Sequence, residues 1–440
     1  MGSMAPSPPQ QLSLADLKAL SVLGQGARGV VFHVVATGAG NNPVAMALKA
    51  MSRAAARHRG RGPGGAHGGG GADGHRRIWF ERDVLLALHH PLLPSLRGVV
   101  ATDAVVGFAI DRCPGGDLKS LMVRRRRTAL PDSVIRFYAA ELVLALEHLH
   151  GLGVVYRDLK PENVLIQGSG HIMLVDFDLS TTLPPPPPPP PPDAEASSPS
   201  LSSRHHLNRK SKNKVAAMIL ACLSSSRHAV AGASSESSTY QPSPQSTTSR
   251  TASSSSSGCG SSGPAAKSKS FVGTEDYVAP EIVAGSGHDH AVDWWGLGVV
   301  LYEMLYGRTP FRGRSRRETF RRVLAAPPEL PPLLAGDGDG GGRAPLRDLI
   351  ARLLDKDPAT RLGARGVRRH AFFRGVDWDR VLDVARPPFI PAPDDDDGSV
   401  GAVALDVEKV VGEVFGGETP SPKAAGSEDV TDDDDFSIFF

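Results

Sequence analysis

The chain has 440 residues and a formal net charge of only +2, so its total charge does not indicate a nucleic-acid-binding protein. Its 40% hydrophobic content is enough for a sizeable core, and its length suggests two or three domains. The 48 glycines and 37 prolines are clustered, which predicts that part of the chain does not pack. The three cysteines show no spacing typical of a disulfide framework or a zinc site, and they fit a reducing, intracellular compartment.

The N-terminal part of the chain predicts a sheet with one helix. Residues 1–16 are expected to be disordered, and residues 17–51 have the pattern of three strands. Residues 54–75 are rich in Gly, Ala, Arg and His, which is typical of a flexible loop. Residues 78–91 have helical apolar spacing up to a proline, and residues 99–111 predict a hairpin.

The following part of the sequence predicts mainly helices. Residues 132–153 form a helical pattern, and two short strand sequences, NVLI and HIML, come after it. Nine consecutive prolines then open a Ser-rich and basic stretch, so residues 183–267 are predicted to be a disordered insert. Folded sequence resumes near residue 270, and residues 374–440 form an extension that ends in an acidic segment.

Glycines between the first two predicted strands form a phosphate-binding pattern. The stretch GQGARG places Gly24, Gly26 and Gly29 in a G-x-G-x-x-G spacing, followed by Val31. Glycine lets the backbone lie close over phosphate groups because it has no Cβ. A dinucleotide-binding fold needs a helix after the third glycine, whereas VVFHVV is a strand sequence. The pattern therefore favours a hairpin lid over ATP.

Charged residues farther along the chain fit phosphoryl transfer. Lys49, in the strand sequence MALK, would grip the α- and β-phosphates, and Glu81 on the next helix would be its ion-pair partner. In the stretch YRDLKPEN, Asp158 would accept the proton of an attacking hydroxyl, and Lys160 would steady the transferring phosphoryl group. Asn163 would bind a second magnesium ion. Positioning and charge neutralisation are most of what phosphoryl transfer needs.

The stretch LVDFDLS departs by one residue from the Asp-Phe-Gly loop expected of a protein kinase. Asp176 would supply the main magnesium carboxylate, because Mg²⁺ takes one or two carboxylates together with phosphate oxygens and water. Asp178 replaces the glycine, which costs backbone freedom and adds a carboxylate. The metal ligand itself is unchanged, so the loop is predicted to work.

Two later motifs predict structural contacts. VAPE contains Glu281 and DPATRLG contains Arg361, which would be its buried ion-pair partner. The motif DWWGLG contains Asp293, for which a structural role is also expected.

In this order the motifs resemble those of eukaryotic serine/threonine protein kinases, over about residues 17–180 and 268–373. YRDLKPEN, FVGTEDYVAPE, DWWGLG, RLG, PPFIP and a C-terminal Phe-x-x-Phe resemble the AGC group. DFD with a long insert before the activation segment resembles the plant-specific eighth AGC subgroup, which includes the PINOID and UNICORN kinases.

The resemblance implies an α+β, bilobal protein kinase fold. A small antiparallel-sheet N-lobe and a larger, mainly helical C-lobe would form a kinase domain over residues 17–373. An AGC-type extension over residues 374–440 would close on the Phe-x-x-Phe motif. DFD would then be a signature of the subgroup.

The resemblance also implies an activating phosphate on Ser270, just before FVGTEDYVAPE. A phosphoserine can order a loop by pairing with arginine. Arg157, beside the catalytic aspartate, is the expected partner, and Arg77 would be a second. Ser268 is a weaker candidate for the phosphate.

The nucleotide and the substrate would each meet further residues. Ile110, just before Asp111 at the hinge, would be the gatekeeper beside the adenine. Acidic side chains at four positions would select Ser/Thr substrates with Arg or Lys on the N-terminal side of the acceptor. These four are Asp117, Glu162, Asp276 and Glu303.

The ends and the insert suggest partners. Phe436 and Phe439 would dock on the small lobe and recruit an upstream phosphoinositide-dependent kinase. The basic insert carries RHHLNRKSKNK before VAAMILACL, and three interpretations stay open. It would contact anionic lipid with help from acylation of Cys222, act as a nuclear address, or be a solvated linker. The expected location is cytoplasmic and/or nuclear, or peripheral at the plasma membrane.

The sequence therefore predicts a monomeric serine/threonine kinase that transfers the γ-phosphate of ATP, with Mg²⁺, to protein substrates in plant growth or auxin-type signalling. No specific nucleic-acid partner is expected. The alternative is a pseudokinase scaffold that recruits partners through its insert and tail, but the catalytic residues are all present. A lipid or small-molecule kinase would use the same chemistry, and GTEDYVAPE and DWW favour a peptide platform instead.

Overall fold

The computed structural model describes only part of the chain. The described residues are 10–26, 29–36, 44–58, 70–124, 130–183, 267–268, 270, 272–331, 343–384, 387–391 and 404–415. The predicted insert lies outside them except at its two ends, Leu183 and Lys267. Phe436 and Phe439 also lie outside the described residues.

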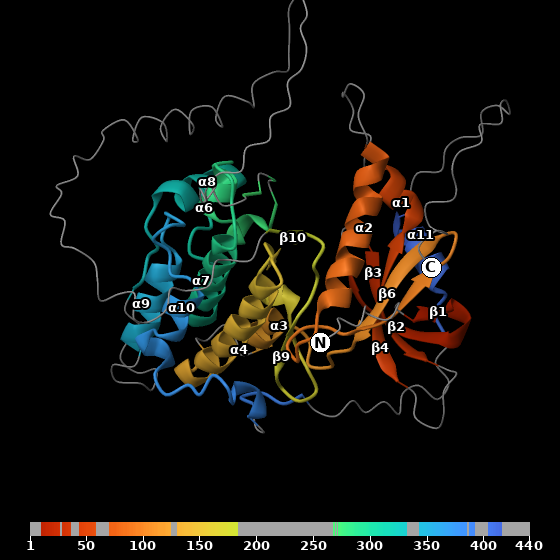
Figure 1. Cartoon of the computed structure of the whole chain (residues 1–440), viewed down its shortest axis with the longest axis horizontal. Helices are drawn as coiled ribbons and strands as arrows, with labels where there is room; N and C mark the ends of the chain where they lie inside the picture. The colour runs from red at the N-terminus through yellow and green to blue at the C-terminus, as the bar shows by residue number, and fades with distance from the viewer. Residues whose placement is uncertain are drawn as a thin grey trace, which may run out of the picture. The chain divides into compact units, whose positions relative to one another are not determined.

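The N-terminal part is a six-stranded sheet with the strand order β1-β5-β6-β4-β3-β2 (Figure 1). All neighbouring strands are antiparallel except β1, which pairs with β5 in parallel. The predicted strands and hairpin are confirmed. The strands are β1 (Gln11–Leu12), β2 (Leu17–Gln25), β3 (Gly29–Ala36), β4 (Ala45–Ser52), β5 (Leu96–Ala101) and β6 (Val105–Asp111).

A helix covers each face of this sheet. On one face Val99 and Phe108 belong to the same buried cluster as Val84 and Leu85 of α2 (Gly70–Ala87). On the other face Phe32 and Leu48 share a second cluster with Val407 and Val411 of α11 (Val407–Phe415). Figure 1 shows α11 in blue behind the strands. The sheet is therefore sandwiched between a helix from the N-terminal part and one from near the C-terminus.

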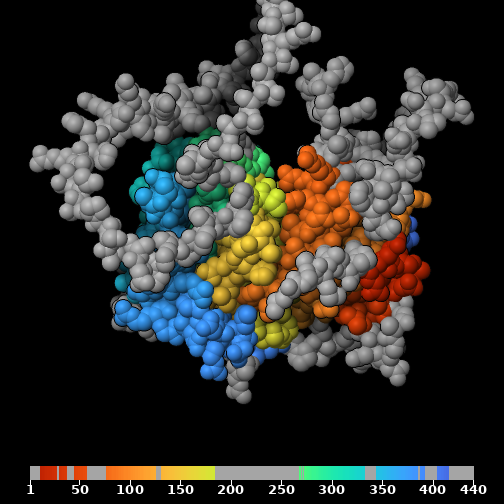
Figure 2. All heavy atoms as spheres, in the orientation of Figure 1, coloured from red at the N-terminus to blue at the C-terminus, as the bar shows by residue number. Residues whose placement is uncertain are grey.

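The second part of the chain is mainly helical, and its core is α7. All of α7 from Val292 to Leu305 is buried, and the helix ends at Gly307, which has a φ of 69°. The helix α4 packs against α7 and α10, and Figure 2 shows the blue C-terminal residues against the yellow α4. These helices are α3 (Leu118–Arg124), α4 (Asp132–Gly151), α6 (Pro280–Val283), α7 (Ala291–Tyr306), α8 (Arg316–Ala325), α9 (Arg343–Leu353) and α10 (Ala364–Arg368).

Short strands between α4 and the insert carry the loops that matter for function. The two predicted strand sequences form a hairpin of β8 and β9, and β7 pairs with β10. Short 3-10 turns lie at Pro161–Asn163 and Glu275–Tyr277. The strands are β7 (Val154–Val155), β8 (Val164–Ile166), β9 (Ile172–Leu174) and β10 (Thr181–Thr182).

Two expectations about order need correction. Residues 11–16 are not disordered, because Gln11–Leu12 adds β1 to the sheet and Leu14–Asp16 forms a 3-10 turn whose Ser13 cap accepts from Ala15. Residues 54–58 and 70–75, at the two ends of the expected flexible loop over residues 54–75, are helical instead. The helix α1 (Arg53–His58) continues from β4, and α2 already begins at Gly70.

The C-terminal extension contains a helix, α11, that was not predicted. Val407, Val411 and Phe415 recur every four residues and so share one side of this helix. The backbone N–H of Leu405, just before the helix, donates to the carbonyl of Ala19 at 2.9 Å. Among the described helices, none has the length and apolar character that a membrane crossing needs.

Candidate active site

The glycine hairpin joins β2 and β3. Gly24 faces Val31 across the pair, and the N–H of Gly26 donates to the carbonyl of Gly29 at 2.9 Å. A Cβ on Gly29 would lie 2.6 Å from the carbonyl oxygen of Ala50, so only glycine fits against β4 there. A Cβ on Gly24 would meet nothing within 4 Å. The hairpin at Gly24 therefore borders open space, as a lid over a nucleotide requires.

Lys49 lies on β4, beside this hairpin, and faces Val31 on β3. Its Nζ is 2.6 Å from Oε1 of Glu81 on α2 and 2.8 Å from Oδ1 of Asp176. Burial opposes the charge, but the two carboxylates outweigh it and hold the pKa of Lys49 above its usual value. Burial likewise opposes ionisation of Asp176, yet Lys49 keeps the pKa of Asp176 below its usual value. Strand, helix and loop thus converge on one charged centre.

The catalytic loop holds Asp158 by both carboxylate oxygens. Oδ1 accepts from the hydroxyl of Thr274 at 2.7 Å, and Oδ2 accepts from Nζ of Lys160 at 2.6 Å. Nδ2 of Asn163 donates to Oδ2 at 3.1 Å. Lys160 also donates to the Thr274 hydroxyl at 3.0 Å. These contacts fix the direction of a carboxylate that is 6% exposed.

Asp293, on α7, fixes the backbone of this loop. Its carboxylate accepts from the N–H of Tyr156 at 2.9 Å and from the N–H of Arg157 at 2.7 Å. His150 lies 2.8 Å away on the same carboxylate. Arg157 has a φ of 68°, which a non-glycine residue adopts only when its surroundings enforce it. The structural role expected of Asp293 is thus to hold the residues just before Asp158.

Asn163 and Asp176 each have an oxygen atom that suits a metal ion. Asn163 uses its amide N–H₂ on the carbonyl and carboxylate of Asp158, so its amide oxygen is the atom left for a cation. Asp176 is an oxygen ligand with a side chain that is 43% exposed. Within the described ranges no three His, Cys, Asp or Glu side chains are arranged to hold a metal by themselves. One carboxylate and one amide oxygen fit Mg²⁺, which takes its other ligands from phosphate and water.

The backbone explains why DFD is tolerated. Asp176 has a φ of 65°, whereas Asp178 is not among the described residues with positive φ. Position 178 therefore does not require glycine, and the strain lies on the metal-ligand residue itself. The carbonyl of Asp178 accepts from Nη1 of Arg77 on α2 at 2.9 Å. This bond ties the loop to the helix that carries Glu81.

Ser270 lies directly against Arg157. The guanidinium donates to the Ser270 hydroxyl at 2.6 Å and to the Ser268 hydroxyl at 3.2 Å. Burial, together with the charge of Arg77, lowers the pKa of Arg157 to about 10. His288 lies 3.3 Å away and forms a backbone bridge with Ser268. The positive charges of Arg157 and Arg77 repel each other. An anion added beside them would therefore be stabilised.

The predicted buried ion pair of Glu281 and Arg361 is present. Nη1 and Nη2 of the arginine donate to the two carboxylate oxygens at 2.7 and 2.9 Å, and the side chains are 1% and 3% exposed. Nη1 also donates to the carbonyl of Ala291, and Nε donates to that of Asp355. The pair joins α6, α7 and the segment before α10.

The hinge residues have separate contacts. Ile110 packs partly buried against the main core at the end of β6. The carboxylate of Asp111 accepts from the N–H of Ser95 at 2.9 Å and from Nε of Arg97 at 2.6 Å. The Asp111 side chain is thereby used within the protein, so only its backbone remains for a nucleotide.

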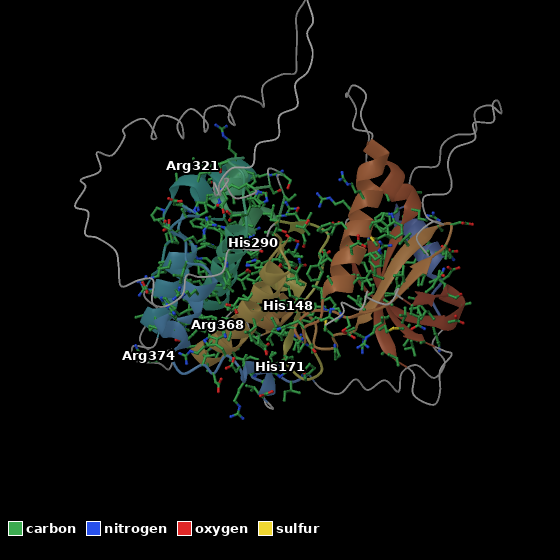
Figure 3. The ribbon with its side chains drawn as sticks, in the orientation of Figure 1. His148, His171, His290, Arg321, Arg368 and Arg374 are labelled. Atoms are coloured by element: carbon green, nitrogen blue, oxygen red, sulfur yellow. The ribbon has the colours of Figure 1, made fainter. Side chains whose placement is uncertain are left out.

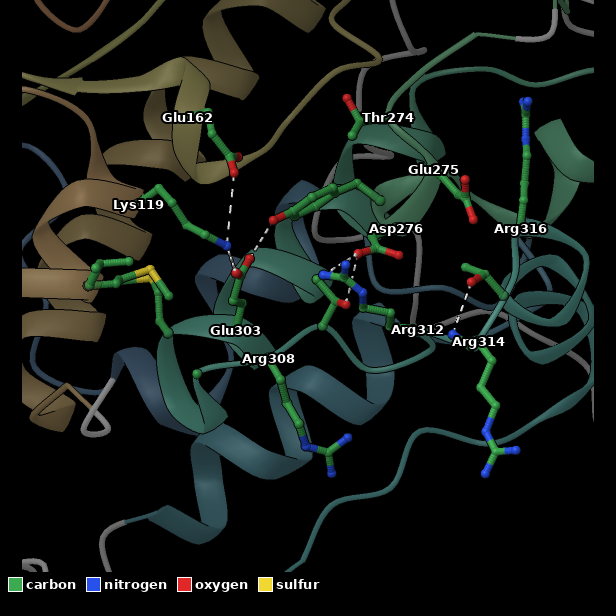
Figure 4. A pocket seen from close by; sticks show the side chains of 18 of the residues that line it. Lys119, Glu162, Thr274, Glu275, Asp276, Glu303, Arg308, Arg312, Arg314 and Arg316 are labelled. Atoms are coloured by element: carbon green, nitrogen blue, oxygen red, sulfur yellow. Dashed lines mark hydrogen bonds and ion pairs between the residues drawn. The ribbon is translucent and has the colours of Figure 1, made fainter. Parts of the chain in front are cut away.

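A cavity of about 590 Å³ lies next to the catalytic loop. Thr274, Glu162, Asp276 and Glu303 all line it (Figure 4). Asp117 does not line it. Its carboxylate instead accepts from the N–H and the hydroxyl of Ser120 at 2.7 and 2.8 Å. Asp117 thus caps the start of α3, and its predicted part in binding substrate stays a prediction.

Sequence reasoning missed several residues of this region. Thr274 links the cavity to Asp158, and Lys119 and Tyr277 both bind Glu303. Glu303 adds to the effect of burial and raises the pKa of the Tyr277 hydroxyl, which stays a donor. Thr274 and Tyr277 sit inside the motif GTEDYVAPE and could have been proposed from it. No signal in the sequence pairs Lys119 with Glu303.

Comparison with known proteins assigns the family. The pattern of the protein kinase domain matches residues 17–200 and 253–373. The chain belongs to the protein kinase family. It is 46% identical to the serine/threonine-protein kinase OXI1 of Arabidopsis thaliana, over 94% of this chain and 89% of that protein. It is 38% identical to the serine/threonine-protein kinase UCN of Arabidopsis thaliana, over 89% and 87%. It is 40% identical to protein kinase PINOID 2 of Oryza sativa subsp. japonica, over 72% and 67%.

The kinase is therefore a plant AGC serine/threonine protein kinase, as its motifs predict. The bilobal kinase fold is confirmed, with a sheet-rich N-lobe and a helical C-lobe. A protein kinase domain works with ATP and a divalent metal ion.

Proposed function

We propose that this kinase transfers the γ-phosphate of ATP to Ser or Thr hydroxyls of protein substrates, with Mg²⁺ as its metal. The observation that carries the proposal is the arrangement around Asp158. Thr274, Lys160 and Asn163 all bind its carboxylate, which lies beside a cavity large enough for a peptide side chain. A base whose direction is fixed before the substrate arrives is what general base catalysis requires.

Each charged residue then has a separate task. The substrate oxygen attacks the γ-phosphorus and gives its proton to Asp158, while the bond to the bridging oxygen of ADP breaks. Lys160 lies 2.6 Å from Asp158 and would neutralise charge on the transferring group. Lys49, held by Glu81, would bind the α- and β-phosphates under the glycine hairpin. When bound, Mg²⁺ neutralises phosphate charge, and Asp176 and Asn163 would hold it.

Lys49 bridges Glu81 and Asp176. Nucleotide phosphates and the metal would compete for Lys49 and Asp176 respectively. The ion pair with Asp176 would therefore be exchanged for ligand contacts, while the pair with Glu81 would stay. This exchange is consistent with Asp176 having the more exposed carboxylate, at 43% against 4% for Glu81.

The same proposal includes activation by a phosphate on Ser270. Ser270 is within hydrogen-bond distance of Arg157, whose neighbour in sequence is Asp158. Arg157 also binds the carbonyls of Leu179 and Ser180, which follow the metal loop. A phosphate would pair with a guanidinium that already contacts both sides of the catalytic centre. It would therefore stabilise the loops in the arrangement described above.

Substrates with a basic residue N-terminal to the acceptor are part of the proposal, because Glu162, Asp276 and Glu303 line the cavity. The proposed docking of Phe436 and Phe439, recruitment of an upstream kinase and the lipid or nuclear role of the insert rest on sequence alone.

The test is transfer of the ATP γ-phosphate, with Mg²⁺, to a Ser peptide that carries basic residues, comparing wild type with Asp158→Asn. The substitution removes the base and keeps the size of the side chain. Transfer by wild type alone supports the proposal. Absence of transfer by wild type, even after Ser270 has been phosphorylated, would contradict it and favour the scaffold alternative.

A further inference from the structure

The cavity beside the catalytic loop is not acidic overall. Five cationic and four anionic side chains line it. The cationic ones are Lys119, Arg308, Arg312, Arg314 and Arg316, and the anionic ones are Glu162, Glu275, Asp276 and Glu303. A substrate preference derived from the acidic residues alone therefore describes only half of the cavity.

Two of the four acidic side chains, Glu303 and Asp276, already pair with the protein's own cations. Lys119 forms an ion pair with Glu303, whose side chain is 3% exposed, and its Nζ lies 3.9 Å from Glu162. Arg312 lies 3.7 Å from Asp276, which also accepts from the hydroxyl of Thr309. These contacts weaken the negative field that would otherwise repel an anion from the cavity.

The other half is an arginine-rich segment that runs from the end of α7 into the first residues of α8. Residues 308–317 contain five arginines and no acidic residue. Figure 4 shows Arg314 and Arg316 on the far side of the cavity from Glu162 and Lys119, and Arg308 below Glu303. The nearest acid along the chain, Glu318, is engaged by Arg322 and by the backbone N–H of Arg314. Glu318 is therefore already engaged, by its own helix and by the backbone.

The existing ion pairs of Arg308 and Arg312 are weak. Arg308 is 3.7 Å from Glu329, and both side chains are more than half exposed, at 54% and 79%. Arg312 is 76% exposed in its contact with Asp276. Exposed ion pairs at such distances contribute little and exchange readily. An anionic group from outside could therefore recruit these arginines at small cost.

The cavity connects this arginine segment to the catalytic base. Thr274 lines the cavity and holds Asp158, and Asp276, two residues later, is 3.7 Å from Arg312. A peptide whose hydroxyl lies at Asp158 and whose chain follows the cavity passes Glu303 and then reaches the arginines. We propose that the side formed by Arg308, Arg312, Arg314 and Arg316 is a subsite for an anionic side chain of the substrate, phosphorylated or carboxylic. The proposal rests on the proposed protein kinase activity.

The first experiment uses Ser peptides that share one acceptor and one arginine. A single Asp, phosphoserine or Asn is placed at each of about five positions on either side of the acceptor. At one position the anionic peptides should have about fivefold lower KM than the Asn peptide, the scale of an exposed ion pair. A larger effect for phosphoserine than for Asp would identify a phosphate subsite, and equal effects would identify a general anion subsite. No anion preference at any position would overturn the proposal.

The matched variants keep net charge equal. Arg314→Gln with Arg316→Gln should remove the KM difference between anionic and Asn peptides. Arg317→Gln with Arg321→Gln should retain it, because both residues are exposed and neither lines the cavity. Figure 3 shows Arg321 pointing away from the helical core. Equal loss in both double variants would indicate a general charge effect and overturn the subsite.

A binding measurement separates this inference from the proposed function. Fluorescence anisotropy of a labelled phosphoserine peptide, without ATP, should show about fivefold weaker binding to the Arg314/Arg316 double variant, and the difference should shrink as NaCl is raised. Failure of phosphate transfer with this difference intact would contradict the kinase mechanism alone. Transfer without the difference would contradict the subsite alone. If the double variant instead lost only its affinity for anionic lipid vesicles, the arginines would be a membrane surface and the subsite would be refuted.

Discussion

The catalytic centre and the cavity beside it use charge in opposite ways. In the catalytic centre Lys49, Asp158 and Asp176 are held by neighbours, yet each presents an atom to the place where ATP and the hydroxyl would meet. In the cavity Glu303 and Asp276 are bound by the cations Lys119 and Arg312. The first region is organised for ligands that the whole family shares. The second is partly closed by the protein's own charges, so selectivity depends on which of these contacts a substrate replaces.

The largest expected effect concerns the catalytic centre. Asp176→Asn should lower kcat about 1,000-fold, because the neutral amide no longer neutralises the metal and no longer pairs with Lys49. Measurement of kcat over a range of Mg²⁺ concentrations, with circular dichroism to confirm folding, checks this.

The matched control is Asp178→Gly, two residues away. Asp178 lacks positive φ, so restoring glycine should change kcat by less than about threefold. If Asp178→Gly instead raised activity strongly, the DFD loop would be an impaired metal loop. The catalytic centre would then not be fully organised for ATP and metal, in contrast to the description above.

The next largest effect is expected at Ser270, the proposed site of the activating phosphate. Ser270→Ala should lower kcat about 10- to 100-fold, because Arg157 and Arg77 would lack the anion that offsets their charges. The assay compares kcat with phosphate occupancy at Ser270 measured by mass spectrometry. Ser268→Ala should have a smaller effect, since its hydroxyl lies 3.2 Å from Arg157 rather than 2.6 Å. A Ser270→Ala enzyme as fast as wild type would remove Ser270 from the regulation.

A third prediction tests the residue that joins the two regions. Thr274→Ala should lower kcat about tenfold, the scale of one hydrogen bond to a charged group, with little change in affinity for ATP. Thr274→Ser keeps the hydroxyl and should stay close to wild type. Equal losses in both variants would show that the methyl group, and not the hydroxyl on Asp158, is what matters.

The smallest expected effect belongs to the cavity. Lys119→Met should lower KM about fivefold for a peptide with an arginine before the acceptor, because Glu303 is left buried without its cation. Lys119→Arg preserves the ion pair and serves as the control. If KM for basic and neutral peptides fell equally, Lys119 would obstruct the cavity by its bulk and not by its charge.

The catalytic centre was predictable from sequence because its residues lie in short motifs. Asp158, Lys160 and Asn163 fall within six residues, and their roles follow from the order of the letters. The cavity was only half predictable. Glu303 and Lys119 are 184 residues apart, and no local pattern indicates that they meet. Asp117 was expected to bind substrate, but its capping hydrogen bonds with Ser120 at the start of α3 were not predicted.

The fold shows the same division. Strands and helices with strong apolar periodicity were predicted, whereas α11 was not. Its sequence, VEKVVGEVF, is only nine residues long and lies in an extension with an acidic end, so its composition did not indicate a buried helix. The spacing of Val407 and Val411 is visible in the sequence, but its meaning depends on an exposed sheet face elsewhere in the chain.

The catalytic domain of this kinase depends on the helix α11 for its stability. Val411 is 1% exposed and Val407 is 6% exposed against the outer face of the sheet, and burial of each is worth roughly 1.5–3 kcal/mol. A fragment that ended at Phe373 would lack α11 and would expose Phe32 and Leu48. This exposed apolar surface would promote aggregation. The same helix is fastened to β2 through Leu405 and to the β5–β6 turn through Glu408 and Thr102. The strand β2 carries the first glycine of the nucleotide hairpin. A protease or partner that loosened α11 would therefore alter nucleotide binding.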